Sequence, residues 1–385
     1  MTVCLYNDDA YMARFTAVVQ SAEALRDGRY DIILDRTAFF PEQGGQSADT
    51  GLLNGRVRVL DAHIHEGIVH HICDDALPVE VAVDGEVDFG HRFSHMQQHT
   101  GEHILSGLCS RTYGCRNVGF HLSDHIVTVD YDKPLSEEQL EHLEDLANRA
   151  VWDNLPVRCW FPTAEEAEQL DYRSKKEISG RLRIVSIPGI DDCACCAPHV
   201  HTTGEVGVIK IMTVMSYKGG VRLSILCGQR ALIALRQKQC RLDQLCRQMT
   251  CGEDELPAVL EKRDKELKET RLHATQLEKE LLIRDAREAR GRESRLLRTE
   301  NADMQAMITA ASCLCEGISV PVGVFSGSDE TGYTFCLMAA GGLREFFAGF
   351  RKALSAQGGG DDRLIRGKCA ASWTEIQAYF ESVQA

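Results

Sequence analysis

A short stretch rich in cysteine and histidine lies in the middle of the chain, and its side chains are those that bind soft and borderline metal ions. Residues 191–201 read DDCACCAPHVH, and their five candidate ligands are Cys193, Cys195, Cys196, His199 and His201. Thiolate and imidazole are the usual ligands of zinc, which takes four of them in a tetrahedron. The stretch therefore predicts a metal site, without ranking its candidates.

A second group of candidate ligands lies far upstream. His95, His99 and His103 follow one another at intervals of four, which places their imidazoles on one face of a helix. Two such nitrogens can bind one ion, so the two groups together indicate a mixed-ligand zinc site. Cobalt, iron or copper fits a closed site of nitrogen and sulfur ligands in a reducing compartment less well.

The same helix offers an alternative chemistry. His99-Thr-Gly-Glu-His103 fits H-x-x-E-H, a zinc-peptidase signature in which the glutamate is the general base. In that case a downstream carboxylate completes the site and the cysteines take no part. A zinc-dependent peptidase that uses Glu102 is therefore a second hypothesis.

Hydrophobic patterning predicts the elements that must position these residues. Short alternating runs at 30–34, 56–60 and 79–83, separated by turn residues, predict a small β-barrel or sandwich over residues 1–88. Residues 89–228 mix helices and strands and contain both groups of ligands. Their predicted elements are a helix at 93–108, a strand at 125–131, a helix that begins with a capping box at Ser136, and strands at 181–187 and 206–212.

The remainder of the chain predicts two further parts. Downstream of Pro257, apolar residues recur at a heptad-like spacing among charged residues. They are Leu260, Leu267, Ala274, Leu277 and Leu281. This spacing predicts a helical, coiled-coil-like segment over 229–305. Residues 306–385 return to a glycine-containing α/β pattern and predict a small C-terminal domain. The predicted fold class is therefore α+β.

Composition narrows the class of protein. The chain of 385 residues has no long apolar run and no secretory leader, so a cytoplasmic protein without a membrane span is expected. Its 16 cysteines are then expected to be thiols rather than disulfides. A net charge of −14 argues against a surface that binds nucleic acid nonspecifically, although it is compatible with a local basic patch.

Three segments, taken in order, resemble the alanyl-tRNA editing proteins and the editing domain of alanyl-tRNA synthetase. Residues 34–46 read LDRTAFFPEQGGQ and resemble the threonine and GGQ segment of the family's barrel. Residues 98–105 read QHTGEHIL and resemble its HxxxH helix, and residues 195–207 read CCAPHVHTTGEVG and resemble its CxxxH segment. Three motifs in family order are far more specific than any one of them.

The resemblance implies one zinc ion per chain, held by His99, His103, Cys195 and His199. It gives no role to His95, Cys193, Cys196 or His201. This chain departs from the family in having CCAPH where CGGTH is more common, and in lacking the synthetases' glutamine near Val118. These departures concern the shape of the pocket and leave the ligand atoms intact.

The resemblance also implies a long form of the family, with an oligomerising helix and a DHHA1-type C-terminal domain that includes Gly358-Gly-Gly360. In this domain residues 363–369 stand where a second glycine run is usual. Since no aminoacylation domain precedes the barrel in this sequence, the free-standing editor is the form that it resembles.

The implied reaction is hydrolysis of the ester that joins serine, or less well glycine, to the 3′ end of alanine tRNA. Serine differs from alanine by one hydroxyl, which a hydrogen-bonding partner can recognise and a merely fitting pocket cannot. Thr37 is the predicted partner, Gly44 and Gly45 are expected to let the backbone approach the substrate, and Gln46 completes the predicted catalytic set. Four protein ligands leave zinc no open position, so either coordination changes or zinc only shapes the pocket.

The expected partner is tRNA(Ala) mischarged with serine or glycine. An arginine-rich stretch offers phosphate contacts and consists of Arg284, Arg287, Arg290, Arg292, Arg295 and Arg298. The heptad spacing also predicts a homodimer through the helical segment. A non-catalytic, zinc-stabilised tRNA-binding protein is a third hypothesis, and editing of threonyl-tRNA is a related possibility with a similar ligand pattern.

Overall fold

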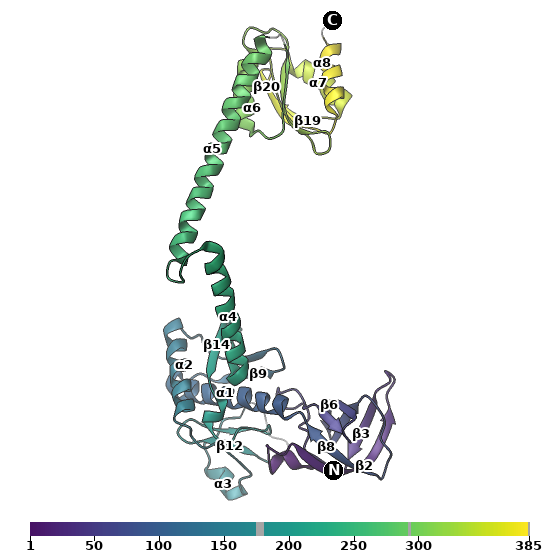
Figure 1. Ribbon diagram of the computed structural model, residues 1–385, viewed down its shortest axis with the longest axis vertical. Coiled ribbons are helices and arrows are strands. Elements are labelled where there is room, and N and C mark those ends of the chain that lie inside the picture. The colour runs from purple at the N-terminus through teal and green to yellow at the C-terminus, as the bar shows by residue number, and fades with distance from the viewer. Residues whose placement is uncertain (175–180, 292–293, 384–385) are drawn as a thin grey trace. The chain divides into compact units, whose positions relative to one another are not determined.

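The computed structural model describes residues 1–174, 181–291 and 294–383. The chain divides into two compact units, Met1–Asp243 and Gln244–Ala385. Both combine helices with sheets (Figure 1), which confirms the predicted α+β class.

A closed six-stranded barrel forms the N-terminal part of the first unit, as the sequence predicts. In spatial order its strands are β2 (Arg14–Ala24), β3 (Tyr30–Leu34), β7 (Ile68–Cys73), β6 (Val57–His65), β5 (Gly51–Leu53) and β8 (Ala82–Val87). Val19, Ile32 and Val57 fill its core, because alternate side chains of each strand point inward. β8 begins three residues later than the predicted strand 79–83, since Glu80 has a left-handed backbone with φ of 64°.

The barrel is followed by α1 (Phe89–Tyr113), which runs toward α2 (Glu137–Trp152) (Figure 1). The predicted capping box at Ser136 is present, with Gln139 as its second member. A four-stranded antiparallel sheet packs with these helices, and its order is β14 (Ile209–Tyr217), β15 (Gly220–Cys227), β10 (Val127–Tyr131) and β9 (Asn117–Leu122). α1 is thus enclosed on several sides, which explains why most of its polar residues are buried.

The first unit also contains smaller elements that lie around the cysteine-rich stretch. A three-stranded sheet consists of β11 (Arg158–Trp160), β12 (Ile184–Ile187) and β13 (Asp191–Ala194), with α3 (Ala164–Gln169) between the first two in sequence. β1 (Val3–Cys4) pairs in parallel with β4 (Arg36–Thr37). The unit also contains two 3₁₀ turns, η1 (Leu5–Asn7) and η2 (Thr203–Val206).

A buried ion pair joins the barrel to α1. The Arg92 guanidinium on α1 donates to the Asp49 carboxylate, with Nε at 2.9 and 2.8 Å from its two oxygens. It also donates to the carbonyls of Ala10 and Ala38, at 2.9 and 2.5 Å. Because Arg92 has no exposed surface and all four contacts reach the barrel side, this side chain fixes how the helix meets the barrel.

The helical segment differs in detail from the prediction over 229–305. It consists of α4 (Gly228–Met249) and α5 (Leu256–Gly291), separated at Thr250, which has a φ of 56°. The helix ends at Gly291, and residues Leu296–Thr299 form β16, because their backbone pairs with β17 (Val322–Ser328). Leu260, Leu267, Leu277 and Leu281 are about half exposed along α5, and the homodimer expected from them stays a prediction.

In addition to α5, the second unit contains a five-stranded sheet with further helices. Its strand order is β16, β17, β18 (Gly332–Met338), β20 (Leu364–Cys369) and β19 (Gln357–Gly360), and its helices are α6 (Met304–Cys315), α7 (Leu343–Leu354) and α8 (Trp373–Ser382). Gly358 and Gly360 lie in the edge strand β19, where a Cβ on Gly360 would stand 1.9 Å from the Leu364 carbonyl oxygen. The glycine run therefore allows close pairing of β19 with β20.

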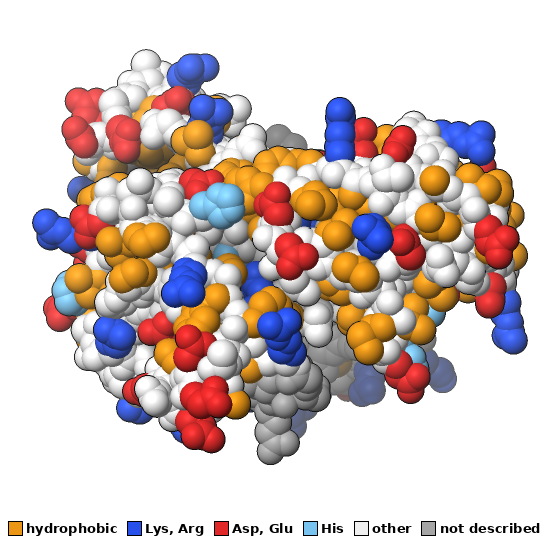
Figure 2. Space-filling model, turned by 90° about the horizontal axis from the view of Figure 1, so that it is seen from below, with side chains coloured by type: hydrophobic (Ala, Val, Ile, Leu, Met, Phe, Trp, Pro, Cys, Tyr) orange, Lys and Arg blue, Asp and Glu red, His pale blue; other side chains and the backbone are white. Residues whose placement is uncertain are grey.

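Within the described ranges no helix combines the length and the apolar character needed to cross a membrane. On the face shown in Figure 2, Lys and Arg side chains are scattered among Asp, Glu and hydrophobic side chains. This distribution agrees with the net charge of −14.

The arginine-rich stretch does not form one exposed surface. Arg295 is buried and donates to the Phe380 carbonyl, and Arg298 stands over the rings of Tyr333 and Trp373 at 5.4 and 5.7 Å. Arg284 and Arg290 pair with acidic neighbours, Arg287 is exposed, and Arg292 lies outside the described residues. Phosphate contact by the whole stretch is therefore not supported, since Arg295 and Arg298 instead pack within the C-terminal unit.

Candidate metal centre

α1 holds two of the predicted ligands rigidly. His99 and His103 lie one turn apart near its middle and are each 1% exposed. The Asp88 side chain caps the start of the helix by accepting from the His91 N–H, and Gly114 ends it in the left-handed conformation. The imidazoles are therefore fixed by a capped and buried helix.

The other two predicted ligands lie in the loop after β13. The Arg183 guanidinium donates to the carbonyls of Cys195 and Ala197, at 3.0 and 2.8 Å. In return the Arg183 carbonyl accepts from the Cys195 N–H at 3.0 Å. Charge-assisted hydrogen bonds thus hold this irregular segment in place and orient Cys195 and His199.

The four predicted ligands converge. The ligand atoms of His99, His103, Cys195 and His199 all lie within 4.8 Å of one another. The Cys195 Sγ is 3.6 Å from His99 Nε2 and 3.4 Å from His199 Nε2. Three imidazoles and one thiol in such a group match the ligand types and number of a tetrahedral zinc site.

Hydrogen bonds to the other ring nitrogens orient the three imidazoles. The Nδ1 atoms of His99, His103 and His199 lie 2.8, 3.0 and 3.0 Å from Gln46 Oε1, Asp191 Oδ2 and Thr100 Oγ1. Since carboxylate and carbonyl oxygens only accept, Nδ1 carries the proton in the first two rings and Nε2 presents a lone pair. This is the arrangement by which proteins fix metal-binding histidines.

One ring nitrogen of this group has no other evident role. His103 Nε2 is buried, and among the described residues it has no hydrogen-bond partner. A buried nitrogen without a partner is costly, so its presence requires an explanation. A metal ion bound by the four side chains supplies one, and the residues present therefore fit zinc.

The electrostatics favour the thiolate of Cys195, which is the form that binds a metal ion. Burial opposes ionisation of Cys195, but its interactions with the His99 and His199 rings, and hydrogen bonds from His103 and His199, outweigh burial and hold the pKa of this thiol well below its usual value. Burial lowers the pKa of His199 to about 3, so its ring is neutral at pH 7. At His103 the effect of burial is outweighed by Cys193 and Asp191, which raise the pKa of the ring. A metal ion bound at Nε2 would displace the proton from this nitrogen.

The GGQ turn of the barrel docks beside this group. Gly45 has a φ of 87°, and a Cβ there would stand 2.5 Å from the Phe120 carbonyl oxygen. The Gly45 carbonyl accepts from the Leu122 N–H at 2.7 Å, which fastens the turn to β9. This docking brings the Gln46 side chain to His99, while the Phe120 ring lies 4.7 Å from the His99 ring.

Comparisons with known proteins show similarity to alanine–tRNA ligases and to an alanyl-tRNA editing protein. Residues 182–223 match the threonyl and alanyl tRNA synthetase second additional domain, and residues 3–89 match the class II (A) tRNA synthetases. The alanine–tRNA ligase of Pyrococcus furiosus is 33% identical over 294 residues, which cover 73% of this chain and 32% of that enzyme. The alanyl-tRNA editing protein Aarsd1 of Rattus norvegicus is 29% identical over 269 residues, which cover 65% of each chain. The chain is homologous to part of these ligases and to this alanyl-tRNA editing protein. The matched part spans about a third of the length of the ligases.

In this homologue of the editing proteins, the candidates without a family role lie outside the four-residue group. His201 stacks on Tyr11 with ring centroids 4.0 Å apart, and Cys196 packs against the apolar cluster that contains Tyr6. Cys193 is buried beside His103 and Asp191. His95 faces Asp124 instead.

Thr37 lies inside the barrel, and its predicted contact with substrate stays a prediction. Its hydroxyl is fully buried in the barrel, 2.9 Å from His71 Nε2, and it accepts from the Phe39 N–H at 3.1 Å. His71 Nδ1 lies 2.9 Å from the Ile32 carbonyl, so Nε2 must accept the Thr37 proton. Both hydrogen-bonding functions of this hydroxyl are therefore used inside the barrel.

The glutamate of the H-x-x-E-H pattern is also engaged elsewhere. The buried Glu102 carboxylate accepts from Ser106 Oγ and Asn117 Nδ2, each at 2.5 Å. It is not part of the four-residue ligand group. The two histidines of the pattern meet Cys195 and His199 where the peptidase alternative expects a carboxylate.

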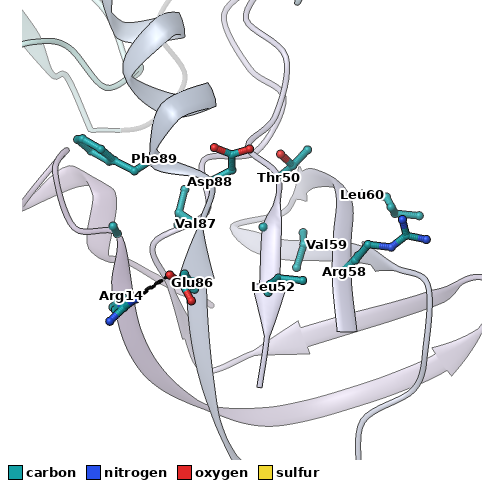
Figure 3. A pocket seen from close by; sticks show the side chains of 12 residues that line it. Arg14, Thr50, Leu52, Arg58, Val59, Leu60, Glu86, Val87, Asp88 and Phe89 are labelled. Atoms are coloured by element: carbon teal, nitrogen blue, oxygen red, sulfur yellow. Dashed lines mark hydrogen bonds and ion pairs between the residues drawn. The ribbon is translucent and has the colours of Figure 1, made fainter. Parts of the chain in front are cut away.

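A separate cavity of about 710 Å³ lies on the barrel and contains none of the predicted site residues. Arg14 and Glu86 form a 2.9 Å ion pair along its wall (Figure 3). Arg58, at its other side, pairs with Asp74. Arg14, Glu86 and Arg58 of its lining are thus each in an ion pair, and the four-residue ligand group lies elsewhere.

Sequence reasoning missed the residues that support the ligands. Asp191 holds His103 and is itself bound by Arg173 through two contacts of 2.7 Å. Thr100 and Arg183 have comparable supporting roles for His199 and Cys195. Asp191 begins the DDCACC stretch and its acidity was a usable signal, whereas nothing in the local sequence marks Arg173 or Arg183.

Proposed function

We propose that this protein is a hydrolase that removes serine, and less readily glycine, from mischarged tRNA(Ala). The observation that carries the proposal is the convergence of His99, His103, Cys195 and His199 beside Gln46. The homology to alanine–tRNA ligases and to a protein named for alanyl-tRNA editing supports it.

His99, His103, Cys195 and His199 would hold the zinc ion, and when bound it would supply a positive charge that polarises the ester carbonyl or its water. The protein's own groups must do the rest. Asp191, fixed by Arg173, keeps His103 oriented, and the low pKa of Cys195 keeps the thiolate available. Because four protein ligands fill a tetrahedron, water must be oriented by neighbouring polar groups unless the coordination changes.

Gln46 is well placed to recognise the serine side chain. Its Oε1 accepts from His99, while its Nε2 is buried and has no hydrogen-bond partner within residues 1–174, 181–291 and 294–383. We infer that this amide donates to the serine hydroxyl. An alanine ester would leave the donor unsatisfied, which is how a polar site discriminates strongly between substrates that differ by one hydroxyl.

The ligand set favours the deacylase over the peptidase, because Cys195 and His199 complete the group and Glu102 is bound to Ser106 and Asn117. The third hypothesis, a tRNA-binding protein without catalysis, predicts that the charged tRNA is bound and is not hydrolysed. Editing of threonyl-tRNA predicts hydrolysis of seryl-tRNA(Thr) rather than of seryl-tRNA(Ala).

The test is deacylation of a panel that contains seryl-, glycyl- and alanyl-tRNA(Ala) and seryl-tRNA(Thr) by the zinc-loaded protein. We expect seryl-tRNA(Ala) to be hydrolysed at least about a hundredfold faster than alanyl-tRNA(Ala), and Cys195→Ala to abolish this. Binding without hydrolysis would overturn the proposal in favour of an adaptor. Peptide cleavage that is lost in Glu102→Gln and kept in Cys195→Ala would favour the peptidase.

A further inference from the structure

The histidines of α1 form two successive pairs rather than one. His91, His95, His99 and His103 follow at intervals of four, and each interval turns the helix by about 40° beyond one full turn. His99 and His103 belong to the metal centre described above. The earlier pair, about two turns closer to the start of the helix, faces Asp124 in the loop between β9 and β10.

The three side chains of this earlier group are within ligand distance of one another. His91 Nε2 lies 2.6 Å from Asp124 Oδ1, and His95 Nε2 lies 3.6 Å from the same oxygen. The two imidazole centroids are 4.2 Å apart. One ligand atom from each side chain falls within a group no wider than 4.8 Å.

His95 is oriented toward this group and has no partner that satisfies it. Its Nδ1 lies 3.0 Å from the His91 carbonyl oxygen, so Nδ1 carries the proton and Nε2 presents its lone pair toward Asp124. The ring is 1% exposed, and Nε2 has no hydrogen bond to any part of the chain that the structure describes. Burial, with a smaller effect from His91, lowers the pKa of His95 to about 4, so the ring is neutral at pH 7.

We propose that His91, His95 and Asp124 form a second binding site for a divalent transition metal ion, separate from the centre at Cys195. Two imidazoles and a carboxylate suit zinc, cobalt or nickel, and three protein ligands leave coordination positions open. Asp124 is more than half exposed, so these positions face water. The carbonyl that holds His95 Nδ1 has the orienting role that hydrogen bonds have in other metal sites.

The surroundings indicate that the second site binds more weakly than the first. Arg230 lies close by, with Nε 2.8 Å from Ser94 Oγ and Nη1 2.7 Å from the Ser123 carbonyl. Its positive charge opposes a cation, as does the partial positive charge at the start of α1. Asp124 and the Asp88 carboxylate, which caps the helix, offset them in part, and the hydrogen bond between Asp124 and His91 must be broken before the metal binds. The site is therefore expected to fill after the centre at Cys195.

The test is a zinc titration of the metal-free full chain, followed by calorimetry and by elemental analysis after gel filtration. We expect two binding events of unequal strength. His95→Ala should remove the weaker event and keep the stronger, Cys195→Ala should do the reverse, and the exposed His121→Ala should keep both. Asp124→Asn keeps the size of the side chain and should weaken the second event by about tenfold or more, which guards against misfolding of His95→Ala.

A single event in the wild-type protein would overturn the second site, as would two events that persist in both His95→Ala and Asp124→Asn. These outcomes are independent of whether the protein deacylates tRNA. An active deacylase that binds one zinc equivalent would overturn only the second site. An inactive protein that binds two equivalents would overturn only the proposed function.

Discussion

Gln46 and His99 join the barrel to the helix that carries the metal ligands. The Gln46 Oε1 atom accepts from His99 Nδ1 at 2.8 Å, and both side chains are 1% exposed. Gln46 lies at the end of a glycine turn that is fastened to β9, so its position does not depend on a flexible loop. One carboxamide thus orients a ligand with its oxygen and offers a donor to substrate with its nitrogen.

Replacement of Gln46 by alanine should therefore impair catalysis while leaving the protein folded. We expect Gln46→Ala to lower deacylation of seryl-tRNA(Ala) by about 10- to 100-fold, the usual effect of losing a hydrogen bond behind a metal ligand. Gln43→Ala is the matched control, since Gln43 is an exposed residue of the same turn. Equal rates for the two variants at equal zinc content would remove Gln46 from the proposed mechanism.

Zinc content should distinguish the three neighbouring cysteines. Cys195→Ala removes the thiolate of the four-residue group and should abolish the tight zinc equivalent. Cys196→Ala changes an apolar contact and should retain it. Cys193→Ala is the more demanding case because this thiol lies beside His103 and Asp191, yet it too should retain tight zinc. Elemental analysis after exhaustive dialysis measures each, and loss of tight zinc in Cys193→Ala would show that the ligand assignment is wrong.

Thr37→Val separates recognition of substrate from support of the barrel. The change keeps the shape of the side chain but leaves His71 Nε2 and the Phe39 N–H without their partner. We expect the free energy of unfolding to fall by about 1–3 kcal/mol, while the ratio of seryl to alanyl ester hydrolysis stays unchanged. Thr37→Ser retains the hydroxyl and is the control. If the ratio collapses at unchanged stability, Thr37 reads the serine hydroxyl directly, as the sequence predicts.

The contrast between Gln46 and Thr37 shows what the sequence could and could not predict. Spacing along one helix and composition along one loop predicted a metal site with several unranked candidates, because such patterns are local properties. The resemblance to the editing proteins then singled out His99, His103, Cys195 and His199. The orientation of Thr37 toward His71, and the support of His103 by Asp191 and Arg173, depend on contacts between distant segments.

The same limit applies to the fold. The barrel strand Tyr30–Leu34 and the capping box at Ser136 were predictable from local pattern and are present. The strand Leu296–Thr299 was not, because an arginine-containing run after a long helix becomes a strand only through pairing with β17. Tertiary pairing overrides local preference at such places.

The stability of the protein should also depend on pH through His71. Burial lowers the pKa of this histidine from 6.5 to about 4, with partial compensation from the Ile32 carbonyl. Between these values the unfolded chain binds a proton that the folded barrel does not, so stability is lost as pH falls from about 6.5 to about 4. The difference corresponds to about 3 kcal/mol at the lower limit.

His71→Gln removes the titrating group and keeps a side chain that can hydrogen-bond to Thr37. Urea unfolding of the wild type and this variant, at pH 7.5 and at pH 4.5, measures the effect. We expect the wild type to lose about 2–3 kcal/mol more than His71→Gln over this range. Protonation of the metal ligands contributes to both proteins and cancels in the comparison. Parallel losses in the two proteins would mean that His71 is not held neutral in the folded barrel, and hence that the hydrogen bond assigned to the Thr37 hydroxyl is wrong.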